Sequence, residues 1–324
     1  MKIKIQEKFN LLVPITRVEF IPANSASVLI GFAWAISEGY VLGFKTIGIF
    51  VSLFLVLSAV GTLGAHWNSY SDYEMDAEDA TKKDLHKSLS DLGKNGLKVI
   101  IRVEMVLAAI IFILFLINSF DWKLIGLWII SVFFAFSYSM PPARFKGRGP
   151  LAFISLCLVL SVLPILFVYL SINQSLSAEF MCFLVGHTMV VYSLIIPTEI
   201  RDYAVDKRFQ VCTMTVWLGL KKVVIFSEIL IVLGSGLIIS SYIKTEYFLN
   251  NPIAIISLLG LVVCNGFVFS KFNQLRKLIN SISRSDGQNK KASALAKNNP
   301  KWITISSIGS MAAALATAIV KIFP

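Results

Sequence analysis

The sequence predicts an all-α polytopic membrane protein, because it is strongly apolar and its apolar residues come in long blocks. Of its 324 residues, 56% are hydrophobic and only 15% are charged, and the mean hydropathy is +0.73. A soluble domain carries roughly 25% charged residues. The blocks are about 20 residues long, which is the length that a helix needs to cross the hydrocarbon core of a bilayer.

Nine apolar segments are expected to span the membrane. They are residues 21–37, 46–66, 99–118, 122–140, 150–171, 178–197, 222–242, 250–270 and 302–321. Pro164 and Pro197 lie inside two of them, which is tolerated when neighbouring helices satisfy the freed carbonyl groups. We expect a single domain over residues 1–324, with the polar and basic segment 273–301 as a partly mobile cytoplasmic linker.

The basic residues are distributed unevenly about these spans. With the N-terminus in the cytoplasm and nine alternating spans, 26 of the 30 Lys and Arg lie on the cytoplasmic side or at the span ends beside it. The other side receives only Lys45, Lys123, Lys244 and Lys321. This asymmetry follows the positive-inside rule and places the C-terminus on the side opposite to the basic loops. Topology and contact with membrane lipids therefore account for the basic pI, and nucleic acid is not expected as a partner.

Two acidic stretches follow the second and the sixth span on the predicted cytoplasmic side. They are NSYSDYEMD, with Asn68, Asp72 and Asp76, and PTEIRDYAVD, with Glu199, Asp202 and Asp206. The spacings i, i+4, i+8 and i, i+3, i+7 place each trio on one side of a helix. Like charges on one helix stripe repel, so a cation is expected to offset them. Carboxylates with an Asn amide suit Mg²⁺, which also binds the oxygens of a substrate phosphate.

Other interpretations of these stretches stay open. Each stripe alone can be a solvated helix end whose partners are nearby lysines. The shared D-Y-x-x-D pattern indicates either an internal repeat of residues 20–140 and 150–270 or two short matches without common origin. A soft-metal site is not expected, because no His has ligand spacing with a Cys.

A basic segment, YSMPPARFKGRG, follows the fourth span. Pro141 and Pro142 end the helix, and Arg144, Lys146 and Arg148 then stand at alternating positions. Three cations so placed suit a polyanion such as a diphosphate. The positive-inside rule is the alternative explanation for these residues.

With these motifs the sequence resembles the UbiA superfamily of intramembrane prenyltransferases. The first family motif, N-x-x-x-D-x-x-x-D, is matched by Asn68, Asp72 and Asp76. The second motif and the Y-S-x-P-P segment are matched by Asp202, Asp206, Lys207, Thr213, Leu218, Gly219, Tyr138, Ser139, Pro141 and Pro142. The chain departs from the family pattern at Gln210, where glycine is common, at Glu199, where aspartate is common, and at Ser88, where proline usually follows the lysine matched by Lys87.

The resemblance implies nine helices around a central cavity with a cytoplasmic cap, opening sideways to the lipid. It implies transfer of a prenyl group from an isoprenyl diphosphate to a lipophilic acceptor. Mg²⁺ would be held by Asn68, Asp72, Asp76, Asp202 and Asp206, with Glu199 behind them. The diphosphate would be bound by Lys87, Arg144, Lys146, Arg148 and Lys207, and Tyr138 would face the allylic cation.

Two rival functions stay open at this point. A terpene cyclase of the same superfamily would use the same acids. Its cation would be quenched within the same substrate molecule and not by a separate acceptor. A lipid or ion carrier with acidic sites is the alternative of another class. A transport path should carry ionisable groups near the bilayer centre, and the acids of this sequence gather at one face instead. The Y-S-x-P-P-x-R-F-K pattern is somewhat closer to family members with large lipophilic acceptors than to those that prenylate small aromatic acids.

Overall fold

The fold is built from helices, as the sequence predicts. The computed structural model describes residues 14–16, 21–39, 43–78, 83–173, 175–245, 250–281 and 286–322. Within these ranges the helical elements are α2 (Ile21–Ser37), α3 (Phe44–Ser71), α4 (Tyr73–Glu78), α5 (Lys83–Asn118), α6 (Trp122–Ser139), the 3-10 turn η2 (Phe145–Gly147), α7 (Pro150–Cys157), the π-helical turn η3 (Leu158–Val162), α8 (Leu163–Leu170), α9 (Ala178–Arg208), α10 (Met214–Leu218), α11 (Leu220–Ile243), α12 (Pro252–Asn280), α13 (Asp286–Ala296) and α14 (Asn299–Ile322).

Eight helical segments in the described ranges are long and apolar enough to cross a membrane. They are Thr46–Ser71, Lys87–Ile117, Trp122–Ser139, Pro150–Leu170, Ala178–Arg208, Leu220–Ile243, Pro252–Asn280 and Lys291–Ile322. Each overlaps one predicted span. The remaining predicted span, 21–37, is α2, whose apolar part Ser25–Ser37 is shorter. The expected multi-pass architecture is therefore confirmed.

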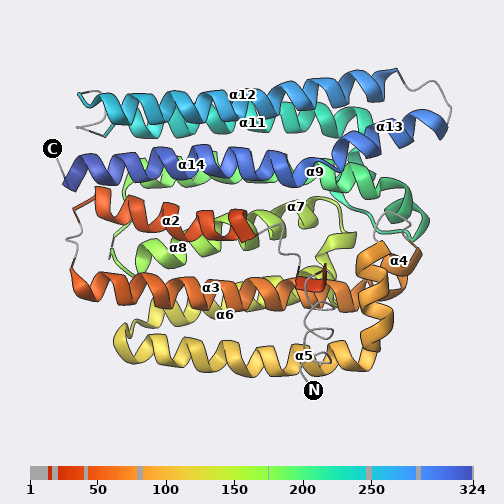
Figure 1. Ribbon diagram of the computed structural model, residues 1–324, viewed down its shortest axis with the longest axis horizontal. Coiled ribbons are helices and arrows are strands. Elements are labelled where there is room, and N and C mark those ends of the chain that lie inside the picture. The colour runs from red at the N-terminus through yellow and green to blue at the C-terminus, as the bar shows by residue number, and fades with distance from the viewer. Residues whose placement is uncertain are drawn as a thin grey trace, which may run out of the picture.

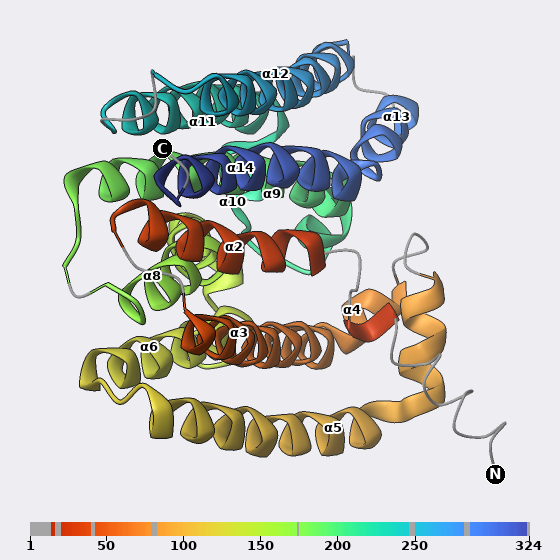
Figure 2. The same cartoon turned by 60° about the vertical axis from the view of Figure 1, so that its left-hand side comes forward.

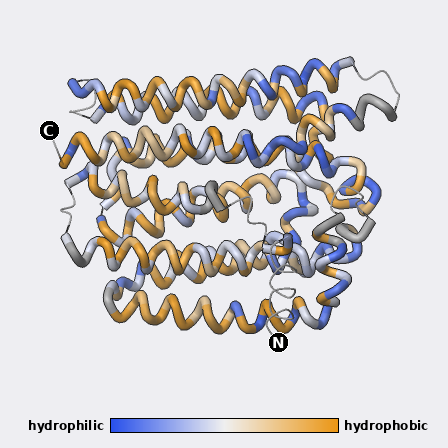
Figure 3. Tube along the Cα trace, viewed as in Figure 1, coloured by the Kyte–Doolittle hydropathy of each residue, from blue (hydrophilic) through white to orange (hydrophobic). Residues whose placement is uncertain are grey.

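The long helices lie side by side, and the short ones gather at one end. Among other contacts, α9 packs against α11, α12 against α14, α14 against α2, and α3 against α5. Helices α4 and α13 lie at one end of this bundle, and α14 finishes at the other (Figures 1 and 2). Hydrophilic residues concentrate at the end that carries α4 and α13 (Figure 3). The polar loops and the last helix thus end on opposite sides, while their assignment to cytoplasm or exterior stays a prediction.

A close helix contact in the bundle joins α9 and α11 and depends on glycine. A Cβ atom on Gly186 would lie 2.7 Å from the carbonyl oxygen of Gly234, and one on Gly234 would lie 2.6 Å from that of Gly186. Small residues let membrane helices approach closely and gain van der Waals contact. This contact holds α9, the helix that carries the second acidic stretch, firmly in the bundle.

Three predicted segments differ locally from expectation. The fifth span, 150–171, is predicted as one helix, but it consists of α7, the π-helical turn η3 and α8. Pro164 lies at the beginning of α8, where its missing N–H is tolerated. Residues 67–98, which connect the second and third predicted spans, are largely helical in their described part and bend at Gly93, whose φ of +70° suits glycine. The described part of segment 273–301, expected as a linker, contains the end of α12, all of α13 and the beginning of α14. Four apolar residues of these helices are buried against the bundle: Leu275, Ile279, Ala292 and Ala296.

Candidate functional site

The first acidic stretch lies where α3 ends. Asp72 caps the helix, its backbone N–H donates to the carbonyl of Asn68 at 2.9 Å, and its side chain is only 2% exposed. Ser139, the last residue of α6, donates its hydroxyl hydrogen to Oδ1 of Asn68 at 2.9 Å. Ser71 donates to the carbonyl oxygen of Ser139 at 2.6 Å. These two hydrogen bonds fix the end of α3, and with it Asn68 and Asp72, against the end of α6.

The prediction that Asn68, Asp72 and Asp76 occupy one continuous helix is wrong. Helix α3 ends at Ser71, Asp72 has φ −93° and ψ 11°, and a second helix, α4, begins at Tyr73. These angles lie in the sparsely populated bridge region where helices are interrupted. Asp76 belongs to α4, and its side chain lies outside the described part of the structure.

The second acidic stretch lies on the uninterrupted last turns of α9, as predicted. Glu199 and Asp206 are buried there, and Asp202 is half-buried. Arg201, which the sequence analysis did not single out, binds Asp202 through two contacts: Nε to Oδ1 at 2.7 Å and Nη2 to Oδ2 at 3.0 Å. A neighbouring arginine is too common a feature to be recognised in sequence as the partner of that carboxylate.

Glu199 is held on both carboxylate oxygens by residues of the second half of the chain. Thr215 donates to Oε2 twice, from its backbone N–H at 2.9 Å and from its hydroxyl at 2.8 Å. The hydroxyl of Tyr192 donates to Oε1 at 3.4 Å. Thr215 lies on α10, so Glu199 ties α10 to α9. This geometry favours a role behind the other acids, as the resemblance implies.

Lys146 joins the two acidic stretches. Its ammonium nitrogen lies 2.5 Å from Oδ2 of Asp72, and the lysine side chain is 12% exposed. Asp206 lies close enough to Lys146, Asp72, Asp202 and Glu199 to interact with each of them electrostatically. The ends of α3 and α9, far apart in sequence, therefore lie near one another, and Lys146 pairs with the acid at the end of α3.

The loop that carries Lys146 rests on the loop that follows α9. The backbone N–H of Gly149 donates to the carbonyl of Cys212 at 2.6 Å, and Arg148 forms an isolated β-bridge with Cys212. Gly149 has φ +53°, and a Cβ atom there would lie 3.2 Å from Cγ of Trp217. Glycine is thus required by both the backbone angle and the tryptophan that packs over it. This contact between the two loops sets the position of Lys146.

The other predicted cations differ in their exposure and in the contacts they make. Arg144 has a left-handed φ of +36°, and its Nε is buried without a hydrogen bond to the described residues. Arg148 is exposed and donates to the carbonyl of Pro142 at 2.7 Å. Lys207 is exposed, with its Nζ 6.0 Å from the ring centroid of Tyr203, and Lys87 is exposed near the beginning of α5. Of the predicted cations, Lys146 is the one for which the described residues give an ion pair with a predicted acid, Asp72.

Tyr138 lies one residue before the end of α6, half-buried and near enough to Tyr192 to interact electrostatically. This places its ring beside the helix end that supports Asn68. Among the described side chains, no group of three or more His, Cys, Asp and Glu forms a ready metal cluster. Mg²⁺ sites in proteins often use only one or two carboxylates and complete their coordination with water and substrate phosphate.

Comparison with protein families decides the family to which this arrangement belongs. The chain matches the UbiA prenyltransferase family over residues 25–279. The chain belongs to this family. The match includes both acidic stretches and the loop of Lys146. A comparison with curated protein sequences finds no significant match.

Solved structures of low sequence identity share the UbiA fold. A digeranylgeranylglyceryl phosphate synthase is 18% identical with a TM-score of 0.60, over 95% of this chain and 99% of that one. A UbiA homologue from Archaeoglobus fulgidus, bound to GPP and Mg²⁺, is 15% identical with a TM-score of 0.57, over 92% and 99%. A ligand-free homologue from Aeropyrum pernix K1 is 13% identical with a TM-score of 0.61, over 86% and 94%.

Proposed function

We propose that this protein transfers a prenyl group from an isoprenyl diphosphate to a lipophilic acceptor in a reaction that requires Mg²⁺. The observation that carries the proposal is the meeting of Asp72, Asp206 and Lys146 at the polar end of an apolar bundle. An isoprenyl diphosphate has the matching chemistry, because it joins an anionic head to a long apolar tail. Membership of the UbiA prenyltransferase family supports it, as do relatives of the same fold bound to GPP or DMAPP with Mg²⁺.

The donor groups around Lys146 suit Mg²⁺. They are oxygen atoms of Asn68, Asp72, Asp202 and Asp206, with Asp76 as a further ligand that sequence alone indicates. Oxygen ligands of this kind are those that a hard divalent cation prefers. Bound Mg²⁺ would stabilise the negative charge that develops on the diphosphate as it leaves.

The protein's own groups would then bind and orient the donor. Lys146 would contact the diphosphate from the side of Asp72, and Arg144, Arg148, Lys87 and Lys207 would surround its outer oxygens. The allylic C–O bond breaks with its electron pair going to the diphosphate. Tyr138 would present its ring face to the allylic cation, a contact worth about 2 kcal/mol when desolvated. A π-electron pair of the acceptor forms the new C–C bond, and the same acceptor carbon loses a proton.

The acceptor is proposed as a class. It is an electron-rich lipophilic compound, either an aromatic quinone precursor or another large lipophilic molecule that reaches the site from the bilayer. The Y-S-x-P-P-x-R-F-K segment, residues 138–146, favours the larger acceptors. The proposal does not depend on this choice, because the ionisation step involves only the donor.

The test is diphosphate release coupled to product identification. Vesicles containing the full chain are incubated with labelled isoprenyl diphosphates of several lengths, with lipid extracts as acceptors, and with or without Mg²⁺. We expect a labelled lipid only with Mg²⁺, and loss of at least 100-fold in rate for Asp72→Ala in a protein that remains folded. Wild-type turnover by Asp72→Ala would contradict the assignment. A cyclised hydrocarbon formed without acceptor would identify a terpene cyclase.

A further inference from the structure

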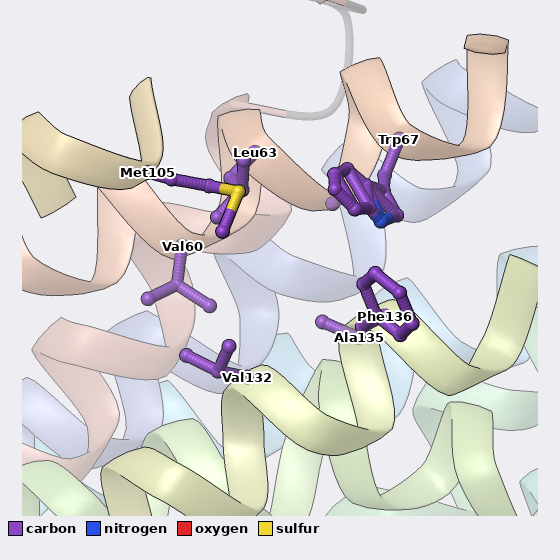
Figure 4. Close-up of a pocket in the computed structure, with 8 residues that line it drawn as sticks. Val60, Leu63, Trp67, Met105, Val132, Ala135 and Phe136 are labelled. Carbon is purple, nitrogen blue, oxygen red and sulfur yellow. The ribbon is translucent and has the colours of Figure 1, made fainter. Parts of the chain in front are cut away.

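A second feature of the molecule, separate from the acidic centre, is an apolar pocket between α3, α5 and α6. Every side chain around it is apolar or aromatic, and Figure 4 shows them converging on one space. Its lining residues are Val60, Leu63, Gly64, Trp67, Met105, Val132, Ala135 and Phe136. The Trp67 and Phe136 rings meet at the end nearest the polar loops, with centroids 4.8 Å apart.

This pocket faces away from the acidic centre. Trp67 and Asp72 are five residues apart, so they point in directions that differ by roughly 140° around α3. The hydrogen bond from Ser71 to the Ser139 carbonyl closes the contact between α3 and α6 just beyond the pocket. A donor held between Asp72 and Asp206 would therefore not occupy it.

The pocket opens to the surface that faces the lipid. Met105 and Phe136, on its two walls, are 46% and 39% exposed, and their neighbours Val106 and Phe133 are more exposed still. An apolar space with such a mouth excludes water and polar solutes. Its volume is only about 30 Å³, so its natural occupant is a short segment of an alkyl chain that lies against the bundle in the bilayer.

Two exposed cations follow the same side of α5 as Met105, toward the polar end of the bundle. Lys98 and Arg102 are exposed on α5 and precede Met105 at helical positions i, i+4 and i+7, which places all three on one side of that helix. Their level is fixed by two contacts between α5 and α3: Glu104 with His66 at 2.7 Å, and Lys94 with Glu74 at 3.4 Å. Arg102 therefore lies at the level of Trp67, the top of the pocket.

We propose that this pocket and its two cations form a binding site for one anionic phospholipid. The acyl chain would lie against Leu63, Trp67 and Met105, and the phosphate would pair with Lys98 and Arg102. The site combines an apolar slot with positive charge at its polar end and one turn beyond it, which matches a lipid whose headgroup is anionic. Cations beside an anionic membrane surface favour such lipids by roughly fivefold each. The site is independent of the prenyl-transfer reaction.

Trp67 lines the pocket, so its fluorescence reports occupancy. The full chain is reconstituted in vesicles of phosphatidylcholine or phosphatidylglycerol with brominated acyl chains, because bromine quenches tryptophan on contact. The signal of Trp67 is taken as the difference between wild type and Trp67→Phe, since the chain has six tryptophans. In mixtures where only one lipid is brominated, we expect phosphatidylglycerol to quench Trp67 at several-fold lower mole fraction than phosphatidylcholine.

Matched variants separate the two parts of the site. Lys98→Gln with Arg102→Gln should abolish the preference for phosphatidylglycerol while phosphatidylcholine still quenches Trp67. Lys221→Gln with Lys222→Gln, an exposed pair on α11, should retain the preference. Ala135→Phe should fill the pocket and reduce quenching by both lipids.

Equal quenching by both lipids in the wild type would overturn the proposal. So would displacement of brominated phosphatidylglycerol by an isoprenyl diphosphate in the absence of Mg²⁺, which would make the pocket a donor site.

Discussion

The ammonium group of Lys146 lies 2.5 Å from a carboxylate oxygen of Asp72, and both side chains are withdrawn from solvent. The lysine comes from the turn after α6 and the aspartate from the end of α3. A buried ion pair of this kind contributes little net stability, but removing one partner leaves an uncompensated charge. When no other cation is bound, the buried carboxylate of Asp72 therefore depends on Lys146 to compensate its charge.

Lys146→Met should destabilise the protein by about 3 kcal/mol, because the Asp72 carboxylate loses its ion pair with this lysine while it stays buried. The measurement is thermal or denaturant unfolding of the purified protein in detergent without divalent ions. The double variant Asp72→Asn with Lys146→Met should recover most of that loss. Lys221→Met, at an exposed position, should stay within about 0.5 kcal/mol of wild type. A double variant as unstable as Lys146→Met alone would show that the lost stability came from packing.

Arg201→Gln should lower the Mg²⁺ concentration needed for half-maximal activity by about fivefold. Arg201 engages both oxygens of Asp202, and a metal ion bound by Asp202, as proposed, would have to replace it there. A partly exposed pair of this kind is worth about 1 kcal/mol, which corresponds to that factor. Arg208→Gln, which removes an exposed cation from the same helix, should leave the Mg²⁺ requirement unchanged. A higher requirement in Arg201→Gln would mean that the arginine helps to bind the diphosphate instead.

The helical spans could be predicted from the sequence because their signal is local. A block of about 20 apolar residues must cross the bilayer whatever surrounds it, and the predicted 46–66 and 178–197 lie within α3 and α9. The interruptions could not be placed in this way. The break at Asp72 and the turn at η3 depend on how α3 and α7 pack against their neighbours. Pro164 does not reveal the turn at η3, because proline is tolerated within membrane helices.

The helical placement of Glu199, Asp202 and Asp206 could also be predicted, because all three lie on one helix, α9; that of the first acidic stretch could not, because α3 ends at Ser71. The partners of these acids could not. Lys146 stands in sequence as one of three alternating cations, and their spacing does not show that it is the one that reaches Asp72. Thr215 holds Glu199 across sixteen positions of sequence, and a threonine carries no pattern that would reveal this.

Thr215→Val should cost about 1.5 kcal/mol of stability. The substitution keeps the volume of the buried side chain but removes the hydroxyl that donates to Glu199, a bond to an acidic group in a buried place. Thr317→Val in α14 is the matched control, since that buried hydroxyl bonds only to the carbonyl of Ala313 in its own helix. The control should lose clearly less. Equal losses in the two variants would mean that Glu199 does not anchor α10 through this hydroxyl.

Gln210→Gly should stabilise the protein by about 0.5–1 kcal/mol. Gln210 follows α9 with a left-handed φ of +57°, and it occupies the position where the family pattern commonly has glycine. A side chain with a Cβ atom pays roughly 1–2 kcal/mol in this conformation, and the greater freedom of glycine in the unfolded chain offsets part of the gain. The residue is exposed, so no packing is lost. Unfolding midpoints of wild type, Gln210→Gly and Gln210→Ala give the answer. Alanine has the same Cβ atom and should leave the midpoint unchanged, and an equal gain in both variants would rule out backbone strain as the cause.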